Sequence, residues 1–453
     1  MLTYELKKSP GVPLYEALYR CIRGDILSGT LQPGEKLPSK RALAQNLEIS
    51  KITVETAYSQ LLAEGYIRSE EKRGYFVEAV ERHAQPASTV PVQKTERQNF
   101  LLDLTANGTE HFPFSVWSRL QREVMLDYGE KLLAPLPNQG IPELRQAIAD
   151  HLAAFRGMHV DPDNILIGAG TDFLYNLLIQ LLGREKIYAV EEPGYGKIRK
   201  VYGAAGVKCV SAAMDSRGVR PDSLEDADVL HCSPSHHFPS GLVTPVSRRM
   251  ELLAWAKEGK WIIEDDYDSE FRFDAHPKPA MQSLDALGRV IYMNTFSKSL
   301  APSIRISYMI LPGALMAEFR QRLGFYSCTV PSFEQYTLAR FLSRGHFEKH
   351  INRMRKFYKN RRNSVISQLQ NCAFADKLTI LEQDAGLHFL LQIDTLLSDR
   401  ELTQRLEQAG IRVKAFSDYF HDNSGDRHCL VVNYSGLKEE TLQLALQQIT
   451  DIM

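Results

Sequence analysis

The sequence predicts a small α+β domain followed by a large α/β domain, and three observations carry this prediction. Residues 79–100 are polar, contain Pro86 and Pro91, and show neither helical nor strand periodicity, which is typical of an interdomain linker. Before them, short amphipathic helices precede two alternating strands. After them, strand and helix patterns alternate along the chain, which indicates a mostly parallel sheet covered by helices.

Chain length and composition set the outer limits of the prediction. At 453 residues the chain is too long for one ordinary core, so we expect domains over residues 1–78 and 101–453. The formal net charge of −1 excludes a polycation, so nucleic-acid binding has to be argued from where the charges lie. Six scattered cysteines, the lack of an apolar run long enough to span a membrane and the lack of a signal peptide predict a cytoplasmic protein.

The first domain contains the pattern of two short helices joined by a tight turn. Ser39 is expected to cap a helix from Lys40 to about Leu47, and Ser50 is expected to cap a second helix. The inward face of the second helix is expected to consist of four residues: Val54, Ala57, Leu61 and Leu62. This arrangement fits a helix-turn-helix.

The outer surface of this domain predicts contact with DNA. Three residues point outward at the start of the second helix, where a recognition helix reaches base edges: Lys51, Thr53 and Glu55. The two strands turn near Gly74 and leave Lys72 and Arg73 at the tip of a wing, available to phosphate or the minor groove. The helical pattern alone leaves a dimerisation or lid element as an equal alternative.

Three segments of the first domain resemble the GntR-type winged helix. They are P-S-K-R-A-L-A at 38–44, I-S-K-I-T-V-E-T-A-Y at 49–58 and L-L-A-E-G-Y-I at 61–67. The resemblance implies binding to double-stranded DNA through seven positions: Ser39, Lys40, Arg41, Ser50, Lys51, Thr53 and Gly74. The family usually has arginine where Lys51 stands, and a lysine lacks the fork that contacts guanine bidentately.

In the second domain, Lys298 is the candidate for bonding a cofactor aldehyde. It follows an apolar strand and has Thr295, Ser297 and Arg305 nearby. Hydroxyls and a guanidinium suit a phosphate dianion, and a nearby cation helps to lower the pKa of a lysine that forms a Schiff base. The alternative is a solvated surface lysine.

Two further elements predict the rest of a cofactor site. The turn Gly168–Thr171 lies between a strand and a helix, where backbone N–H groups bind anions, although such turns are commonly structural. Asp265 ends the strand WIIEDDYD, and a buried carboxylate there would keep a pyridine nitrogen protonated. The alternative for Asp265 is a helix-capping or surface acid, which is what we expect of its neighbours Glu264 and Asp266.

These elements resemble the fold-type I PLP-dependent aminotransferases, and together with the winged helix they resemble MocR regulators over essentially the whole chain. The resemblance implies pyridoxal 5'-phosphate as cofactor, with a Schiff base at Lys298 and the pyridine nitrogen on Asp265, which stands 33 residues earlier. It implies that Tyr267 bonds the phenolic oxygen and that Tyr195 stacks on the ring, with core packing as the alternative for Tyr195. The implied phosphate ligands are Gly170, Thr171, Thr295, Ser297 and Arg305.

The same resemblance implies the assembly. A large subdomain is expected over about residues 135–320, with a small subdomain formed by the flanking segments. A homodimer is expected, with two winged helices that read two half-sites of a promoter.

Two positions depart from the enzymes. Aminotransferases have N-P-[TS]-G where Phe238 opens F-P-S-G, so His236, His237 or Ser235 would have to compensate unless these residues are structural. They also have an arginine that holds the α-carboxylate of the substrate, where Val431 stands here. Without that clamp the substrate is neither bound nor oriented, so transamination is expected to be weak or absent.

The sequence therefore predicts a regulator that senses pyridoxal phosphate or an amine-like effector through Lys298. One alternative is a competent aminotransferase with an appended DNA-binding domain. Another is a degenerate domain that binds no cofactor and only dimerises.

Overall fold

The computed structural model describes residues 2–4, 6, 13–79, 100–106, 108, 111–257, 259–273, 278–382, 385–421 and 425–450. Apart from its first and last residues, the predicted linker 79–100 lies outside the described residues. The chain separates into two compact units, Met1–Arg97 and Gln98–Met453, and each is considered by itself. None of the described helices is long and apolar enough to cross a membrane.

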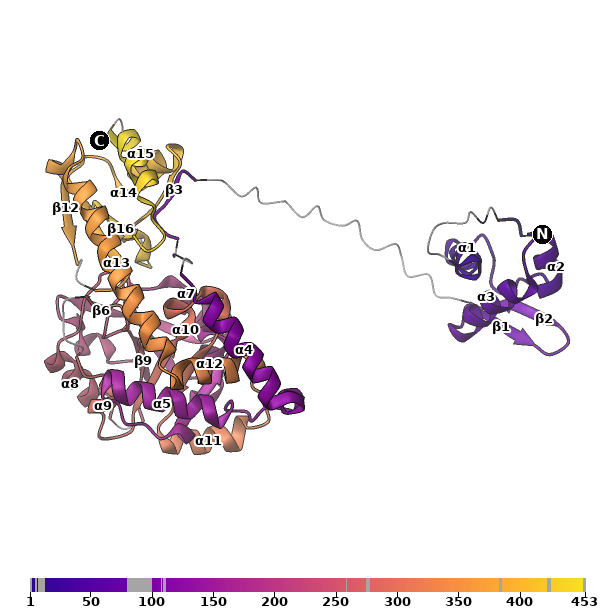
Figure 1. The fold of residues 1–453 in the computed structure, drawn as a ribbon, viewed down its shortest axis with the longest axis horizontal. Helices are drawn as coiled ribbons and strands as arrows, with labels where there is room; N and C mark the ends of the chain where they lie inside the picture. Colours follow the sequence, from indigo (N-terminus) through magenta and orange to yellow (C-terminus); the bar gives the residue numbers. More distant parts are fainter. Residues whose placement is uncertain are drawn as a thin grey trace. The chain divides into compact units, whose positions relative to one another are not determined.

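The first unit is a helical domain with a two-stranded wing (Figure 1). Its elements are α1 (Leu14–Ser28), α2 (Lys40–Asn46), α3 (Lys51–Ala63), β1 (Ile67–Glu70) and β2 (Gly74–Val77). Both predicted caps are confirmed, because Ser39 accepts from the Ala42 N–H and Ser50 from the Thr53 N–H, each at 3.1 Å. The expected inward position of Leu62 is wrong: Tyr58 is buried instead, and Leu62 lies outside the stripe of Val54, Ala57, Tyr58 and Leu61.

The second unit is built on an eight-stranded sheet in the order β4-β11-β10-β9-β8-β5-β6-β7. The strands are β4 (Ile165–Gly168), β5 (Ile187–Glu192), β6 (Lys208–Asp215), β7 (Gly218–Val219), β8 (Val229–Cys232), β9 (Trp261–Asp265), β10 (Val290–Thr295) and β11 (Ser307–Ile310). The run β10-β9-β8-β5-β6 is parallel, as predicted, whereas β11 is antiparallel to both of its neighbours. Strands β4, β8 and β10 are buried along their whole length, as expected of a sheet that is covered on both faces.

Helices cover this sheet (Figure 1). They include α4 (Phe114–Tyr128), α5 (Pro142–Arg156), α6 (Thr171–Leu182), α7 (Gly196–Ala204), α8 (Val246–Trp255), α9 (Met281–Leu284), α11 (Gly313–Leu323) and α12 (Ser332–Ser343). The carboxyl ends of β5, β8, β9 and β10 share one edge because these strands are parallel. Ligands bind at such an edge in open α/β sheets.

A second sheet is formed by the C-terminal segment. It runs β12-β13-β16-β15 and is antiparallel throughout, with β12 (Leu378–Leu381), β13 (His388–Ile393), β15 (Lys414–Ala415) and β16 (Cys429–Asn433). Three helices belong to the same C-terminal segment: α13 (His346–Gln370), α14 (Asp399–Gln408) and α15 (Glu439–Thr450). The long helix α13 extends from the part of the unit that contains α12 to the part that contains β12 (Figure 1). The early strand β3 (Leu102–Asp103) pairs in parallel with β14 (Ile411–Arg412), so both ends of this unit join here.

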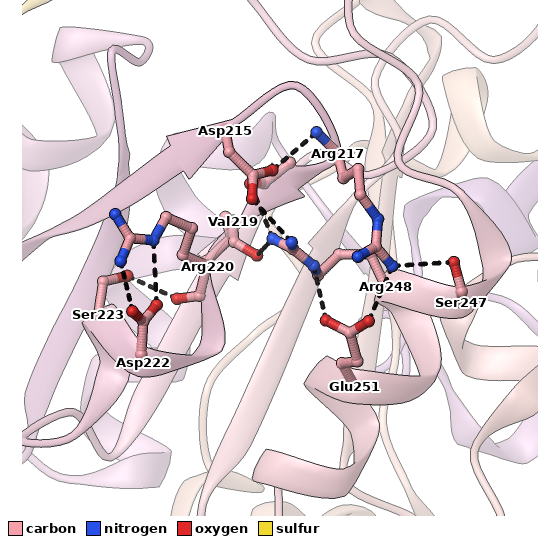
Figure 2. Close-up of polar contacts among 10 residues, drawn as sticks. Asp215, Arg217, Val219, Arg220, Asp222, Ser223, Ser247, Arg248 and Glu251 are labelled. Carbon is pink, nitrogen blue, oxygen red and sulfur yellow. Dashed lines mark hydrogen bonds and ion pairs between the residues drawn. The ribbon is translucent and has the colours of Figure 1, made fainter.

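Charged residues hold the free edge of the large sheet at the β6–β7 hairpin. Figure 2 shows Arg248 of α8 between Asp215, at 2.8 Å, and Glu251, also at 2.8 Å. Arg248 also donates to the Val219 carbonyl at 2.7 Å, and its guanidinium lowers the pKa of Asp215. These contacts tie the two-residue edge strand to α8, and short charged edges resist pairing with another chain.

Candidate cofactor site and DNA-binding surface

The strand ends of the large sheet bring Lys298 and Asp265 to the same edge. Asp265 is the last residue of β9, and it is paired in parallel with Met293 of β10. Lys298 lies in the single turn α10 (Phe296–Ser299), directly after β10. Burial lowers the pKa of Lys298, an effect that the carboxylate of Asp268 opposes. A lowered lysine pKa increases the share of uncharged amine, which is the form that bonds an aldehyde.

Asp265 is a buried carboxylate with one committed oxygen and one open oxygen. Its Oδ2 accepts from the Tyr175 hydroxyl at 2.6 Å and lies 3.4 Å from His231 Nε2. The opposite nitrogen of His231 is 2.6 Å from the Tyr202 hydroxyl. Asp265 Oδ1 has no hydrogen-bond partner among the residues that the structure describes. A protonated pyridine nitrogen supplies the donor that such an oxygen lacks.

The two acids beside Asp265 do different things. Glu264 is the capping acid expected, because its carboxylate accepts from the Met281 and Gln282 N–H groups at the start of α9, both at 2.9 Å. The same expectation for Asp266 is wrong. Asp266 forms a fully buried ion pair with Arg156 at 2.9 Å and accepts from the Tyr292 hydroxyl at 2.6 Å.

The loop that replaces the enzymes' N-P-[TS]-G segment places one histidine beside Tyr267. His236 Nδ1 lies 3.3 Å from the Tyr267 hydroxyl and 2.8 Å from Asp268 Oδ2. His237 bonds Ser240 at 2.7 Å instead, and burial lowers the pKa of His237 to about 3. Of the three residues proposed to compensate for the missing asparagine, the geometry therefore favours His236.

His236 is itself tightly held. The position of Gly386 explains why: an added Cβ there would lie 1.8 Å from His236 Cε1, so only glycine fits against the ring. Ser235, the third candidate, is bonded to Arg156 through its hydroxyl at 3.1 Å and to Arg272 through its carbonyl at 2.7 Å. Ser235 thus anchors the loop while His236 faces Tyr267.

Three of the predicted phosphate ligands meet at the first turn of α6: Gly170, Thr171 and Arg305. Gly170 caps this helix with φ +89°, and a Cβ on it would lie 2.2 Å from Arg305 Nη2, so the glycine lets the guanidinium approach the turn. Thr171 is the first residue of α6. Ser297 Oγ is buried and has no hydrogen-bond partner among the described residues. A dianion bound here would receive the helix N-terminus, a hydroxyl and a guanidinium.

Thr295 differs from the other four ligands that the resemblance implied. Its Oγ1 accepts from the Ser297 N–H at 3.1 Å and from the Ser307 hydroxyl at 2.8 Å. The side chain therefore caps α10 and ties it to β11. It fixes the turn that carries Lys298, whatever else it contacts.

Tyr195 precedes α7 and is 51% exposed, so core packing does not account for it. Its ring meets Phe238 edge-on, with centroids 6.0 Å apart. Phe238 in turn packs edge-on against Tyr419 at 5.1 Å and His388 at 5.0 Å. An exposed tyrosine beside an aromatic wall is available for stacking on a planar ring.

The two positions that depart from the enzymes meet in one apolar cluster, which we call the apolar wall. It consists of Leu390, Cys429 and Val431, with Phe238, Phe416 and Tyr419 packed against them. Arg427 does not replace the missing clamp: its guanidinium lies over the ring of Phe420, and its backbone N–H donates to the Asp399 carboxylate. The residues present therefore fit pyridoxal 5'-phosphate but place aliphatic and aromatic groups where an α-carboxylate would need a cation.

The predicted DNA-facing residues of the first unit differ in whether their side chains make contacts within the described part of the unit. Arg41 and Lys51 are exposed, and Gly74 begins β2 with φ +118°. Lys40 is paired with Glu55 at 2.7 Å and lies over the Tyr75 ring. Three polar residues belong to the helix caps, because Thr53 Oγ1 contacts Ser50 Oγ at 2.9 Å and Ser39 caps α2.

The sequence interpretation missed Ile52 on this surface. Ile52 is the second residue of α3 and is 74% exposed. Its signal was present in the helical period, because position 52 lies opposite the buried stripe.

Comparisons with known proteins agree with both units. Residues 14–77 match the model for bacterial regulatory proteins of the gntR family, and residues 101–449 match the model for aminotransferase class I and II. The crystal structure of an archaeal alanine:glyoxylate aminotransferase aligns with a TM-score of 0.69 at 25% identity, over 78% of this chain and 90% of that one.

Several curated relatives match over nearly the full length of this chain. The HTH-type transcriptional regulator YdeL of Bacillus subtilis is 35% identical, over 99% of this chain and 98% of its own. The probable rhizopine catabolism regulatory protein MocR of Rhizobium meliloti is 32% identical, over 98% and 94%. The pyridoxine biosynthesis transcriptional regulator PdxR of Corynebacterium glutamicum is 31% identical, over 95% and 94%.

The chain combines a GntR-type winged helix with the fold-type I aminotransferase fold, as predicted. It belongs to the family of MocR-type HTH transcriptional regulators. Pyridoxal 5'-phosphate is the cofactor of this aminotransferase fold.

Proposed function

We propose that this regulator responds to pyridoxal 5'-phosphate, or to an amine without an α-carboxylate, bound at Lys298. The observation that carries the proposal is the contrast within one site. Lys298, Asp265 and Tyr267 would suit the cofactor, whereas Phe238 and Val431 belong to the apolar wall. Proteins that keep a cofactor site without a substrate clamp retain binding and lose the orientation that catalysis requires.

The residues of the site would divide the work as follows. The bound cofactor supplies an aldehyde that bonds an amine and a ring that withdraws electrons. Lys298 would offer the amine, whose pKa burial lowers. Asp265, held by Tyr175, would accept from the ring nitrogen, and the α6 N-terminus with Arg305 would bind the phosphate.

The tyrosine end of the site would sense the ligand through hydrogen bonds. Tyr267 and His236 would face the phenolic oxygen, with Asp268 fixing the orientation of the imidazole. Ligand exchange at Lys298 would favour one of two conformations of a homodimer. The two conformations would differ in the affinity of the paired winged helices for two half-sites of a promoter. We place the protein in the cytoplasm, where its DNA and the cofactor pool meet.

Two titrations on the full-length protein test this proposal. Pyridoxal phosphate should produce an absorbance band at about 410–430 nm in the wild type and not in Lys298→Ala. The matched control is Lys278→Ala, because burial also lowers the pKa of Lys278, which lies beside Arg249 and Arg272 rather than at the strand ends. Loss of the band in both variants, or in neither, would contradict the assignment of Lys298.

The second titration measures the affinity for DNA recovered from a randomised duplex library. Ligand should change the Kd of the wild type by roughly 5- to 150-fold, the usual range of allosteric coupling, and should leave Lys298→Ala unchanged. An equal Kd with and without ligand would overturn the sensor. Complete conversion of the cofactor by an amino acid, with turnover on adding a keto acid, would instead support the aminotransferase alternative.

A further inference from the structure

The exposed face of α3 is the part of the first unit whose chemistry the family assignment leaves open. Four residues with helical spacing lie on it: Ile52, Glu55, Thr56 and Ser59. The opposite face is buried in the core of the unit, so this side of the helix is turned outward by the packing. A recognition helix presents such a face to the major groove, and the residues of its first turns reach the bases.

Ile52 is an apolar side chain in the first turn of this face. It is 74% exposed, while the side chains on either side of the first turn, Ser50 and Thr53, are bonded to each other. Ile52 therefore projects beyond a cap that is already satisfied. The apolar feature of the major groove is the C5-methyl group of thymine. Contact between the Ile52 side chain and that methyl group would remove both apolar groups from water, which is favourable.

Glu55 lies one turn further along the same face. Its carboxylate is 2.7 Å from Lys40 Nζ, and that hydrogen bond lowers the pKa of Glu55, so the group is ionised. A free carboxylate would be repelled by phosphates, but Lys40, held over the Tyr75 ring, balances its charge. In the major groove a carboxylate accepts from the N4 amino group of cytosine. Lys40 is thus a positioning residue for Glu55.

We propose that α3 reads a thymine through Ile52 and a cytosine through Glu55. The two residues are three apart, which is about 4.5 Å along a helix, and successive base pairs are about 3.4 Å apart. The two bases should therefore lie within two base steps of each other in each half-site. The inference concerns base specificity, and it does not depend on what binds at Lys298.

Replacing thymine by deoxyuridine tests the Ile52 contact, because it removes only the methyl group. Duplexes are first selected from a randomised library with the full-length wild type, and each thymine is then replaced in turn. In each half-site, one of these single replacements should weaken the binding of the wild type about fourfold, the value of one buried methyl group. The same replacement should leave the binding of Ile52→Ala unchanged. Ile52 is exposed, so the variant retains the core.

The chain offers a matched control in Leu62, another exposed aliphatic residue of α3, ten residues further along the helix. Leu62→Ala should keep the full deoxyuridine effect. The Ile52 contact is wrong if no thymine is sensitive, or if the sensitive thymine is equally sensitive in Ile52→Ala.

Glu55→Gln tests the second contact by a change of preference rather than a loss. A glutamine pairs bidentately with adenine, so libraries selected with Glu55→Gln should show adenine where the wild type selects cytosine. Lys40→Met should weaken the cytosine preference without introducing adenine, because the carboxylate remains but is no longer held. An unchanged base preference in Glu55→Gln would overturn the role of Glu55.

Discussion

At one end of the site around Lys298, charged and hydroxyl groups are buried together; at the other end, Phe238 and Val431 pack in the apolar wall. Both ends lie in the same compact unit. Among the described residues, Asp265 Oδ1 and Ser297 Oγ at the polar end have no hydrogen-bond partner, and an unsatisfied buried group costs about 1–3 kcal/mol. The apolar end carries no such cost.

This difference between the two ends indicates which parts of a ligand the site can bind. Buried polar groups that the fold leaves unsatisfied are maintained where a ligand satisfies them. The polar end offers partners that would suit the nitrogen, hydroxyl and phosphate of pyridoxal phosphate, whereas none of the residues that make up the apolar wall is a cation that would hold a carboxylate. Single substitutions at either end test this difference.

The largest effect is expected from putting the enzymes' arginine back. Val431 is 4% exposed in β16, opposite Leu390 and Lys414, so Val431→Arg would bury an unpaired cation beside another cation. We expect the free energy of unfolding to fall by about 3–5 kcal/mol in denaturant titrations. Val431→Met, which keeps the wall apolar but enlarges the side chain, should cost about 1–3 kcal/mol. A stable Val431→Arg whose Tm rises with amino acids would mean that a carboxylate site survives.

A smaller effect is expected from removing the charge at the polar end. Asp265→Asn keeps the shape and the Tyr175 contact but loses the charge that holds a protonated ring nitrogen. The Kd for pyridoxal phosphate should rise about 10- to 100-fold, the value of one charge-assisted hydrogen bond. Glu264→Gln is the matched control, since that buried neighbour faces α9. Equal losses in both variants would show a general effect of strand β9.

The pH dependence of stability tests the cost of burying the carboxyl group of Glu270 near Asp266. Burial, reinforced by Asp266, raises the pKa of Glu270 to about 8, from an ordinary value of 4.5. Between these pH values the folded chain holds a proton that the unfolded chain has lost. Rising pH therefore destabilises the folded state, by up to about 1.4 kcal/mol per pH unit.

Glu270→Gln removes this loss. Denaturant titrations from pH 5.5 to 7.5 should show the stability of the wild type falling relative to that of Glu270→Gln. The exposed Glu440→Gln should follow the wild type, because Glu440 lies on the surface of α15. Parallel curves for all three proteins would mean that Glu270 is ionised in the fold.

From the sequence, the residue types at the polar end could be predicted, but most of the hydrogen bonds between them could not. Strand periodicity placed Asp265 and Lys298 each at the carboxyl end of a strand, and the structure pairs these two strands in parallel. Tyr175 and His231 were missed, since they contact Asp265 from 90 and 34 residues away in the chain. No local pattern reports a contact between distant elements.

Some residue types have two competing roles. Thr295 was predicted to bind phosphate, which stays a prediction, and the structure shows that it also caps the helical turn that follows it. Asp266 was expected to cap a helix or face solvent. This was wrong because its partner Arg156 lies on α5, which is distant in the sequence. The apolar wall was foreseen only as two separate departures, whose contact is set by the packing of the small sheet.

The smallest expected effect tests whether Tyr175 positions Asp265 or merely fills space. Tyr175→Phe removes the donor to Asp265 Oδ2 and should weaken cofactor binding by about 0.5–1.5 kcal/mol, or roughly two- to tenfold. Tyr188→Phe is the matched control, because that buried hydroxyl faces the Gly183 carbonyl instead.

A double-mutant cycle separates the two roles of Tyr175. If its hydroxyl acts through the carboxylate, Tyr175→Phe should cost less in the Asp265→Asn background than in the wild type. If the two losses add, Tyr175 only packs against β9, and the orientation of Asp265 is set by His231 and the strand itself. The polar end would then owe its geometry to the sheet rather than to its hydrogen bonds.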